Sequence, residues 1–337
     1  MRAPDFWQRR SDWRSLLLSP AAFAYGWAAR CRARTVQPWT ATVPVICIGN
    51  LVAGGAGKTP VALAIMALLQ GQGIAAHFLT RGHGGNLGGS LTGPVRVDPA
   101  AHGAADVGDE PLLLAEAAPT WVAGDRVAGA KAAIAAGAQA IVMDDGFQNP
   151  SLTKSLSLIV VDGGYGFGNG LLLPAGPLRE TVTEGLAHAQ AVVLIGEDRT
   201  GAAAEVGNTL PVLHARLTPA PGIDPAGTDL FGRRVLAFAG IGRPEKFFDS
   251  VREAGAEIAE KLSFPDHHPY RAAEIDAILK QADDAGLLPV TTRKDWVRLP
   301  SDRRSGIAVL DITLTWQDEA ALAALLAGLF TVRQDDV

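Results

Sequence analysis

Apolar and polar residues alternate in two different patterns along most of the chain. Short apolar runs, many of them rich in valine and isoleucine, are separated by longer alanine-rich runs. The short runs predict strands at 43–49, 75–80, 119–124, 138–145, 156–163 and 189–196. The longer runs predict helices at 58–73, 109–118 and 126–138. Continuously apolar strands that alternate with helices are typical of an α/β fold, in which helices cover both faces of a parallel sheet as an α/β/α sandwich.

This pattern weakens at 216–230, where proline and glycine are frequent, and then resumes. Further strands are predicted at 234–242, 287–292 and 307–316, and further helices at 244–255, 271–286 and 318–330. The predicted organisation is a first domain at 41–215, a linker at 216–230 and a smaller α/β/α domain at 231–337, whose last helix packs back on the first domain.

The composition is that of a folded protein in a reducing compartment. Of the 337 residues, 48% are hydrophobic and 19% are charged, which is sufficient apolar material for a packed core. The two cysteines, Cys31 and Cys47, are too few for a disulfide framework and favour the cytosol. A formal net charge of −5 gives no reason to expect nucleic acid as a partner, and no motif implies a protein partner.

The segment 1–40 differs from the rest of the chain. Its first 34 residues carry seven arginines and two aspartates, whereas the whole chain is acidic. The uncharged residues 15–29 would span roughly 22 Å as a helix, less than the ~30 Å of a bilayer core. We interpret the segment as a helix that begins at Ser19-Pro20 and ends in arginines. Two roles stay open: a helix that dips its apolar end into an anionic membrane surface, and an ordinary surface helix.

A strand, a glycine-rich loop and a helix follow one another at 44–69. The loop and the start of the helix contain Gly54, Gly55, Ala56, Gly57, Lys58 and Thr59. Glycines allow backbone N–H groups to face an anion, lysine neutralises phosphate oxygens, and the threonine hydroxyl is a ligand for Mg²⁺. Val52 replaces the first glycine of the P-loop pattern, so the phosphate site is predicted from the strand–loop–helix context. The alternative is a glycine-rich turn with an incidental lysine.

Acidic residues occupy two further element boundaries. Asp144 and Asp145 end a predicted strand, which is where P-loop proteins hold magnesium directly or through water. Asp109 and Glu110 open a helix after the glycine-rich stretch 82–108, which is long enough to be a lid. Acids at the beginning of a helix are ordinarily caps, and the pattern alone favours that interpretation for this second pair.

Basic side chains stand at several predicted turns. Arg81, Arg126 and Arg179 follow strands beside glycine or proline, where arginine suits bidentate phosphate contacts or simply a solvated surface. His267 follows Asp266 at the entrance of a helix in the second domain. A histidine beside a carboxylate is a candidate general base, although the pattern alone favours a capped turn for this pair.

Nine motifs in order resemble the tetraacyldisaccharide 4'-kinases of lipid A biosynthesis. They are IGNLVAGGAGKTP, LTRGHGG, VGDEP, GDR, DDGFQ, PAGPLRE, GIGRPEKFF, FPDHH and TTRKD. The resemblance extends over about residues 13–330 and implies two α/β/α domains joined by a β-linker. It also implies a peripheral enzyme on the cytoplasmic face of the bacterial inner membrane. Such an enzyme transfers the ATP γ-phosphate to the 4'-hydroxyl of a tetraacylated glucosamine disaccharide 1-phosphate, forming lipid IVA.

The resemblance also implies roles for individual residues. Asp109 matches the catalytic base of the family and His267 the residue that works with it, while Lys58 assists transfer. The nucleotide would be bound by Gly54, Gly55, Ala56, Gly57, Lys58, Thr59, Arg126 and Arg179. Magnesium would be held by Thr59, Glu110, Asp144 and Asp145. The implied cofactors are ATP and Mg²⁺, and the implied partners are the lipid A disaccharide 1-phosphate precursor and an anionic membrane surface.

The chain departs from the family pattern at three places. His83 replaces a tyrosine, Asn149 replaces a histidine after DDGFQ, and Arg293 replaces a glutamate in TTRKD. Two other classes of function remain as alternatives. Another P-loop enzyme, such as a small-metabolite kinase or an ATP-dependent ligase, would have a soluble acceptor. A non-catalytic nucleotide switch would leave Asp109 and His267 without a role.

Overall fold

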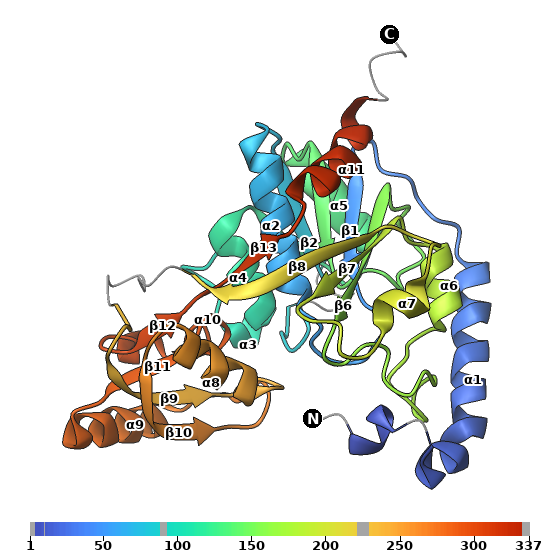
Figure 1. Ribbon diagram of the computed structural model, residues 1–337. Coiled ribbons are helices and arrows are strands. Elements are labelled where there is room, and N and C mark those ends of the chain that lie inside the picture. Colours follow the sequence, from blue (N-terminus) through green and yellow to red (C-terminus); the bar gives the residue numbers. More distant parts are fainter. Residues whose placement is uncertain (1–3, 10, 88–92, 221–228, 332–337) are drawn as a thin grey trace.

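A computed structural model describes residues 4–9, 11–87, 93–220 and 229–331. Over these residues the strands form one sheet of nine strands and one of four, and helices pack on both faces of each (Figure 1). The predicted α/β fold with parallel sheets is therefore confirmed. Most of the predicted linker, 221–228, lies outside the described residues, as do residues 88–92 of the predicted lid.

The large sheet carries the P-loop on a central strand. Its strands are β1 (Val45–Gly49), β2 (Ala76–Thr80), β3 (Val95–Arg96), β4 (Thr120–Val122), β5 (Ala140–Asp144), β6 (Leu156–Asp162), β7 (Ala191–Ile195), β8 (Val212–Pro219) and β13 (Ile312–Trp316). Their order is β13-β8-β7-β6-β1-β5-β2-β4-β3, and the neighbours are parallel except for β13–β8 and β4–β3. The carboxyl ends of β6, β1 and β5 therefore meet at one edge, where α/β sheets bind their ligands.

Helices cover both faces of this sheet. They are α2 (Lys58–Gly71), α3 (Ala104–Val107), α4 (Asp109–Ala117), α5 (Arg126–Ala135), α6 (Val182–Ala187), α7 (Ala202–Val206) and α11 (Glu319–Thr331). Ile46 and Ile48 of β1 enter the core shared with α2, α4 and α11, whereas Val45 and Cys47 enter the core on the opposite face. Because side chains alternate between the faces of a strand, two cores require strands that are apolar throughout.

The small sheet has its own pair of cores. Its strands are β9 (Arg234–Ala239), β10 (Glu257–Ser263), β11 (Leu288–Thr292) and β12 (Ala308–Leu310), all parallel, in the order β10-β9-β11-β12. Phe247 and Phe248 of α8 (Pro244–Glu253) pack on one face, and Ile275 and Ile278 of α9 (Ala272–Ala285) pack on the other. Two short helices, α10 (Arg293–Trp296) and η2 (Ser301–Arg303), lie between β11 and β12.

The segment 307–316, predicted as one strand, belongs to two sheets. β12 ends at Leu310 in the small sheet, and β13 begins at Ile312 and pairs antiparallel with β8 in the large sheet. Asp311 lies between them and accepts two hydrogen bonds from Arg293, at 2.8 and 2.7 Å. The predicted linker also overlaps β8 as far as Pro219. Strands β8 and β13 therefore carry the chain between the two sheets.

Strand β10 was not expected from the sequence. Its residues, EIAEKLS, alternate between exposed and half-buried and include three charged side chains. The strand lies at the edge of the small sheet and pairs only with β9, so one side and one face of it meet solvent. The predictions relied on buried, continuously apolar strands, and an edge strand does not have that pattern.

The first long helix, α1 (Trp13–Thr35), begins seven residues earlier than predicted. Asp12 caps it by accepting from the N–H of Arg14 at 2.9 Å, and the helix passes through Pro20. The Ser19 hydroxyl donates to the Ser15 carbonyl at 2.8 Å in the turn before this proline. α1 lies along the outer side of the large-sheet unit beside α6 (Figure 1). Over the described part of the chain, no helix is both long enough and apolar enough to cross a membrane.

The C-terminal helix α11 packs on the large sheet through Leu322 and Leu326. Replacing the fully buried Leu326 with alanine is expected to lower the free energy of unfolding by about 2–5 kcal/mol, because a cavity remains where the side chain was. Urea unfolding followed by circular dichroism measures this loss. The matched control is Leu17→Ala on the exposed face of α1, which should change stability by less than about 0.5 kcal/mol. Equal losses in the two variants would contradict the packing of α11.

Candidate active site

The glycine-rich loop connects β1 to α2. Gly57 is the N-cap of α2 with φ of 87°, a left-handed conformation that disfavours any side chain. A Cβ atom there would also lie 2.7 Å from Cδ1 of Ile195. Lys58 and Thr59 form the first turn of the helix, as predicted from the strand–loop–helix pattern. The loop thus directs the positive end of a helix toward the carboxyl edge of the sheet.

A neighbouring segment fixes the first half of the loop. The N–H of Ala53 donates to the carbonyl of Pro177 at 2.7 Å, and the N–H of Arg179 donates to the carbonyl of Leu51 at 2.8 Å. Val52, the residue that departs from the P-loop pattern, is buried in this pairing. Its side chain therefore contributes to packing at a position where the usual pattern needs a flexible glycine.

Asn50, which the sequence analysis did not single out, ties the loop to its lysine. The fully buried side-chain amide donates to the Gly54 carbonyl at 3.2 Å and accepts from the Lys58 ammonium at 3.3 Å. Lys58 also lies 3.4 Å from a carboxylate oxygen of Asp145. These contacts hold the ammonium over the loop. The position of Asn50, directly after the apolar strand, was the available signal.

Asp144 and Asp145 occupy different environments. The Thr59 hydroxyl donates to Oδ2 of Asp144 at 3.3 Å, while Oδ1 of Asp144 is buried without a hydrogen-bond partner among the described residues. Burial, together with the nearby Glu110, raises the pKa of Asp144. Burial also acts on Asp145, but the charges of Lys58 and Arg179 outweigh it and lower its pKa. Among the described residues, the buried Asp144 carboxylate therefore has no ion pair within 4.0 Å, whereas Asp145 has two.

Arg179 and Arg126, the predicted phosphate-binding arginines, are both close enough to Asp145 to interact with its charge. Arg179 donates to Oδ1 of Asp145 at 3.2 Å. Arg126 is buried and donates to the Ala123 carbonyl, while its Nε has no partner among the residues described. Burial and the nearby Arg81 lower the pKa of Arg126 to about 10. Arg126 is thus a desolvated cation beside the carboxyl edge of the sheet.

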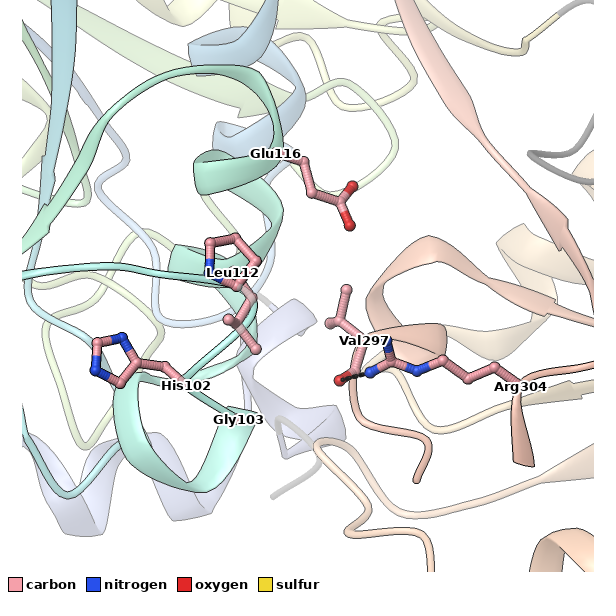
Figure 2. Close-up of a pocket in the computed structure, with 7 residues that line it drawn as sticks. His102, Gly103, Leu112, Glu116, Val297 and Arg304 are labelled. Atoms are coloured by element: carbon pink, nitrogen blue, oxygen red, sulfur yellow. Dashed lines mark hydrogen bonds between the residues drawn. The ribbon is translucent and has the colours of Figure 1, made fainter. Parts of the chain in front are cut away.

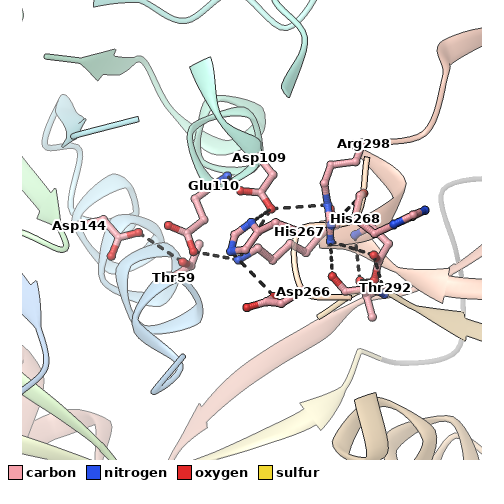
Figure 3. A network of polar contacts seen from close by, with 12 residues as sticks. Thr59, Asp109, Glu110, Asp144, Asp266, His267, His268, Thr292 and Arg298 are labelled. Carbon is pink, nitrogen blue, oxygen red and sulfur yellow. Dashed lines mark hydrogen bonds and ion pairs between the residues drawn. The ribbon is translucent and has the colours of Figure 1, made fainter. Parts of the chain in front are cut away.

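Asp109 and His267 meet across the two units of the molecule. Nδ1 of His267 lies 3.0 Å from Oδ2 of Asp109, which is only 4% exposed (Figure 3). Burial alone would raise the pKa of Asp109, but the hydrogen bond from His267 and the charges of Lys294 and Arg298 lower it to about 2. The carboxylate therefore stays ionised beside the ring. The capped-turn explanations favoured by pattern alone do not account for this contact.

Glu110 lies between the Asp109–His267 pair and the Asp144–Thr59 pair (Figure 3). Its carboxylate accepts from the ammonium of Lys294, which belongs to α10 of the small-sheet unit, at 2.9 Å. Over the described ranges, no three carboxylate, histidine or cysteine side chains converge on a preformed metal cage. Mg²⁺ is commonly held by one or two carboxylates together with water and substrate phosphates, a mode that needs no such cage.

Lys294 and Arg298 were missed by the sequence analysis as site residues. Lys294 lies 3.8 Å and Arg298 lies 3.5 Å from Oδ2 of Asp109. The motif TTRKD, which contains Lys294, was used for the resemblance, but nothing in the pattern indicated that its lysine reaches a carboxylate 184 residues earlier in the chain. Such a contact follows from the approach of the two units and has no local signature.

Two of the departures from the family pattern have local structural roles. The side-chain oxygen of Asn149 accepts from the N–H of Ser151 at 3.0 Å and from its hydroxyl at 2.8 Å, which is the geometry of an Asx turn. Arg293 bonds to Asp311, as described above. The side-chain oxygen of Asn149 therefore stabilises the turn in which it lies.

A small cavity lies between α4 and the segment 297–304 (Figure 2), and none of its lining residues belongs to the glycine-rich loop. It has a volume of about 60 Å³ and is lined by His102, Leu112, Glu116, Val297 and Arg304, among others. It is too small for a nucleotide, and we do not assign it to the site.

A glycine-rich loop that leads from a central parallel strand into a helix beginning at Lys58, with carboxylates on the adjacent strand, places this protein among the P-loop α/β proteins. Within that class, the family model for tetraacyldisaccharide-1-P 4'-kinase matches residues 14–331. The chain belongs to this family.

Individual relatives and a solved structure agree with that placement. The chain is 55% identical over 339 aligned positions to a tetraacyldisaccharide 4'-kinase of Rhodospirillum centenum, covering 99% of this chain and 98% of the relative. It is 51% identical to the corresponding protein of Rhodospirillum rubrum, with 99% of both chains covered. A crystal structure of LpxK from Aquifex aeolicus in complex with ATP has the same fold, with a TM-score of 0.76 and 24% identity over 94% of this chain and 99% of that chain.

Proposed function

We propose that this protein transfers the γ-phosphate of ATP to the 4'-hydroxyl of a tetraacylated glucosamine disaccharide 1-phosphate. This is the reaction of the family. In this protein, the observation that supports it is the contact between Asp109 and His267 beside the glycine-rich loop. Asp109 belongs to the large-sheet unit, which also carries the glycine-rich loop, and His267 belongs to the small-sheet unit. The contact therefore brings an acid–base group of one unit to the phosphate-type loop of the other. A non-catalytic nucleotide switch does not require an acid–base pair.

The nucleotide is bound at the carboxyl edge of the large sheet. The backbone amides of Gly54–Thr59 surround the phosphates, the Lys58 ammonium lies over the β/γ oxygens, and Arg126 and Arg179 neutralise the remaining charge. What supports this assignment is the helix start at Lys58 and the cluster of Lys58 and Arg179 around Asp145. On nucleotide binding, phosphate oxygens replace Asp145 as partners of these cations.

Magnesium would be held beside the loop by the Thr59 hydroxyl, Asp144 and Asp145, with Glu110 as a further ligand, directly or through water. The donor set fits because a buried oxygen of Asp144 has no partner among the described residues, and because Thr59 already contacts the same carboxylate. When bound, Mg²⁺ neutralises charge on the phosphate oxygens. Its presence would also reverse the raised pKa of Asp144 by favouring the ionised form.

The acceptor oxygen attacks the γ-phosphorus in line, the bond from phosphorus to the bridging oxygen breaks, and ADP leaves. The hydroxyl proton passes to Nε2 of His267. Asp109 is too enclosed to take it directly, since one of its oxygens accepts from the Glu110 N–H at 3.0 Å and the other from His267. The ring of His267, by contrast, is 43% exposed. Asp109 orients the ring and stabilises the charge that the proton brings.

The reaction is tested by incubating the protein with ATP, Mg²⁺ and the tetraacylated disaccharide 1-phosphate, and by weighing the lipid product by mass spectrometry. One added phosphate on the 4' position is expected. The deacylated disaccharide 1-phosphate serves as the water-soluble comparison. Transfer to soluble acceptors with none to the acylated one would indicate another P-loop enzyme and contradict the proposal.

Helix α1 provides contact with the membrane that holds the acceptor. Its exposed side chains Trp13, Leu16, Leu17, Phe23 and Trp27 fall within about 120° of the helix circumference at 3.6 residues per turn. Arg32 and Arg34 lie in the last turn. This is the pattern of a helix that inserts apolar side chains among lipids and keeps cations at anionic headgroups. The protein is thereby peripheral to the cytoplasmic face of the bacterial inner membrane.

Replacing Leu16, Leu17 and Phe23 together with serine is expected to weaken binding to vesicles that contain phosphatidylglycerol. Each buried apolar side chain contributes about 1.5–3 kcal/mol, so the affinity should fall at least 10²-fold. Co-sedimentation with vesicles measures the affinity. The matched control is Phe231→Ser, because Phe231 is 77% exposed, as Phe23 is at 73%, but belongs to the small-sheet unit. Unchanged binding by the triple variant would favour an ordinary surface helix.

A further inference from the structure

Arg298 links the two units beside the Asp109–His267 pair. Its side chain is only 5% exposed, although arginine normally keeps its guanidinium in water. Nε lies 3.5 Å from Oδ2 of Asp109, and Nη2 donates to Asp295 at 2.8 Å. The guanidinium therefore touches a carboxylate from each unit at once (Figure 3).

The same guanidinium also donates hydrogen bonds to two backbone carbonyls next to His267. Nη1 donates to the His268 carbonyl at 3.2 Å, and Nη2 donates to the Gly240 carbonyl at 3.0 Å. The N–H of His267 donates to that same Gly240 carbonyl at 3.0 Å. His267 has φ of 57°, a left-handed conformation that is unfavourable for a non-glycine residue and persists where its surroundings enforce it.

Asp295 anchors Arg298 from the other side. It is fully buried and accepts from the Gly240 N–H at 2.9 Å, from the Tyr270 hydroxyl at 2.8 Å and from the Thr292 hydroxyl at 2.6 Å, in addition to Arg298. Asp295 thus fixes the side chain of Arg298, and Arg298 in turn fixes the backbone turn at His267. Lysine cannot reproduce this arrangement, because one ammonium does not present donors in the planar fork of a guanidinium.

We propose that Arg298 is a positioning residue for phosphoryl transfer, which holds the strained His267 turn and the Asp109 carboxylate in mutual contact across the two units. The inference rests on the proposed role of the Asp109–His267 pair. Arg298 itself touches neither the glycine-rich loop nor the reacting atoms. Its effect on turnover therefore passes through His267, and it disappears when His267 is gone.

A double-mutant cycle on the full-length protein tests this. Arg298→Met, His267→Ala and the double variant are assayed for kcat and for the KM of ATP with the acylated disaccharide 1-phosphate. Arg298→Met is expected to lower kcat by about 10²-fold, the loss that follows when a reacting group is misplaced by about 1 Å. In the His267→Ala background the same change should cost less than about 3-fold. The KM of ATP should stay within about 3-fold of the wild-type value.

Arg298→Lys and Arg304→Met are the companion variants. Arg298→Lys keeps the charge and loses the fork, so kcat should recover only in part. Arg304 is the matched control because it donates to the carbonyls of Val297 and Leu299 and stacks on Trp296 in the same segment, without contacting Asp109. Arg304→Met should leave kcat near the wild-type value. Melting temperatures of all variants show whether each is folded at the assay temperature.

Each other outcome has a definite meaning. An equal loss from Arg298→Met in both backgrounds, full activity of Arg298→Lys, or an equal fall in Arg304→Met would overturn the positioning role, since the loss would then come from general packing or from charge alone. Unchanged kcat in His267→Ala would remove the pair from the mechanism and with it the basis of the inference. A normal loss in His267→Ala with full activity in Arg298→Met would overturn this inference alone.

Discussion

Replacing Asp109 with asparagine is expected to lower kcat by about 10²–10⁴-fold, the usual contribution of general acid–base catalysis. Asparagine has nearly the same shape as aspartate, so packing at this buried position is preserved. It has no charge, however, and leaves the imidazolium of His267 without its anionic partner. The KM of ATP should change little, because Asp109 lies on α4 and is separate from the glycine-rich loop.

Steady-state kinetics with the acylated disaccharide 1-phosphate measure this effect. The control is Asp198→Asn, the same chemical change at a carboxylate that accepts from the N–H groups of Ala202 and Ala203 at the start of α7. Asparagine keeps one side-chain oxygen for these N–H groups and leaves the Asp109–His267 contact unchanged, so the control should keep its kcat. Turnover of Asp109→Asn within about 2-fold of the wild-type rate would remove Asp109 from the mechanism.

Replacing Lys58 with methionine is expected to lower kcat by about 10²–10³-fold, the range seen when one preorganised donor to transition-state charge is lost. The Lys58 ammonium is held between Asn50 and Asp145 over the loop, so it is in place before the nucleotide arrives. Methionine fills a similar volume without charge. Part of the loss should appear in the KM of ATP, since the lysine also contacts the ground-state phosphates.

The matched control for this variant is Lys131→Met. Lys131 is an exposed lysine on α5 of the same unit, and its ammonium lies 5.3 Å from the ring centroid of Trp39. Losing an exposed cation–π contact costs about 0.5–1 kcal/mol of stability and should not affect turnover. Lys58→Arg gives a second readout, because a planar guanidinium does not reproduce the compact ammonium that contacts both Asn50 and Asp145. Wild-type kcat in Lys58→Met would refute the assignment of the phosphate site.

Much of the large sheet was predictable because its signals are local. Parallel strands buried on both faces are continuously apolar, and the helices between them are rich in alanine. The glycine-rich loop and the paired aspartates at 144–145 stand where strands end, and strand ends meet at one edge of a parallel sheet. Lys58, Thr59, Asp144 and Asp145 were therefore brought together by topology that the sequence pattern already implied.

Other features had no such signal. Strand β10 is half polar because it lies at an edge. The single run 307–316 divides between two sheets because the pairing partner changes at Asp311, and one aspartate within an apolar run does not by itself indicate such a change. The helix start at Trp13 was missed because Pro20, a usual first-turn residue, is tolerated inside α1. In each case the outcome depends on what packs or pairs nearby.

By itself, the sequence determined the α/β architecture, the phosphate-binding loop and the carboxylates beside it, because each depends on neighbours within one strand–loop–helix unit. The contact between Asp109 and His267, and the roles of Lys294 and Arg298 around it, were decided only by the tertiary structure. These residues are between 158 and 189 positions apart from Asp109, and their side chains acquire partners only when two separately packed sheets are brought face to face. Charged residues at such an interface follow no periodic pattern in the sequence, because their interaction energy arises only when they are buried together.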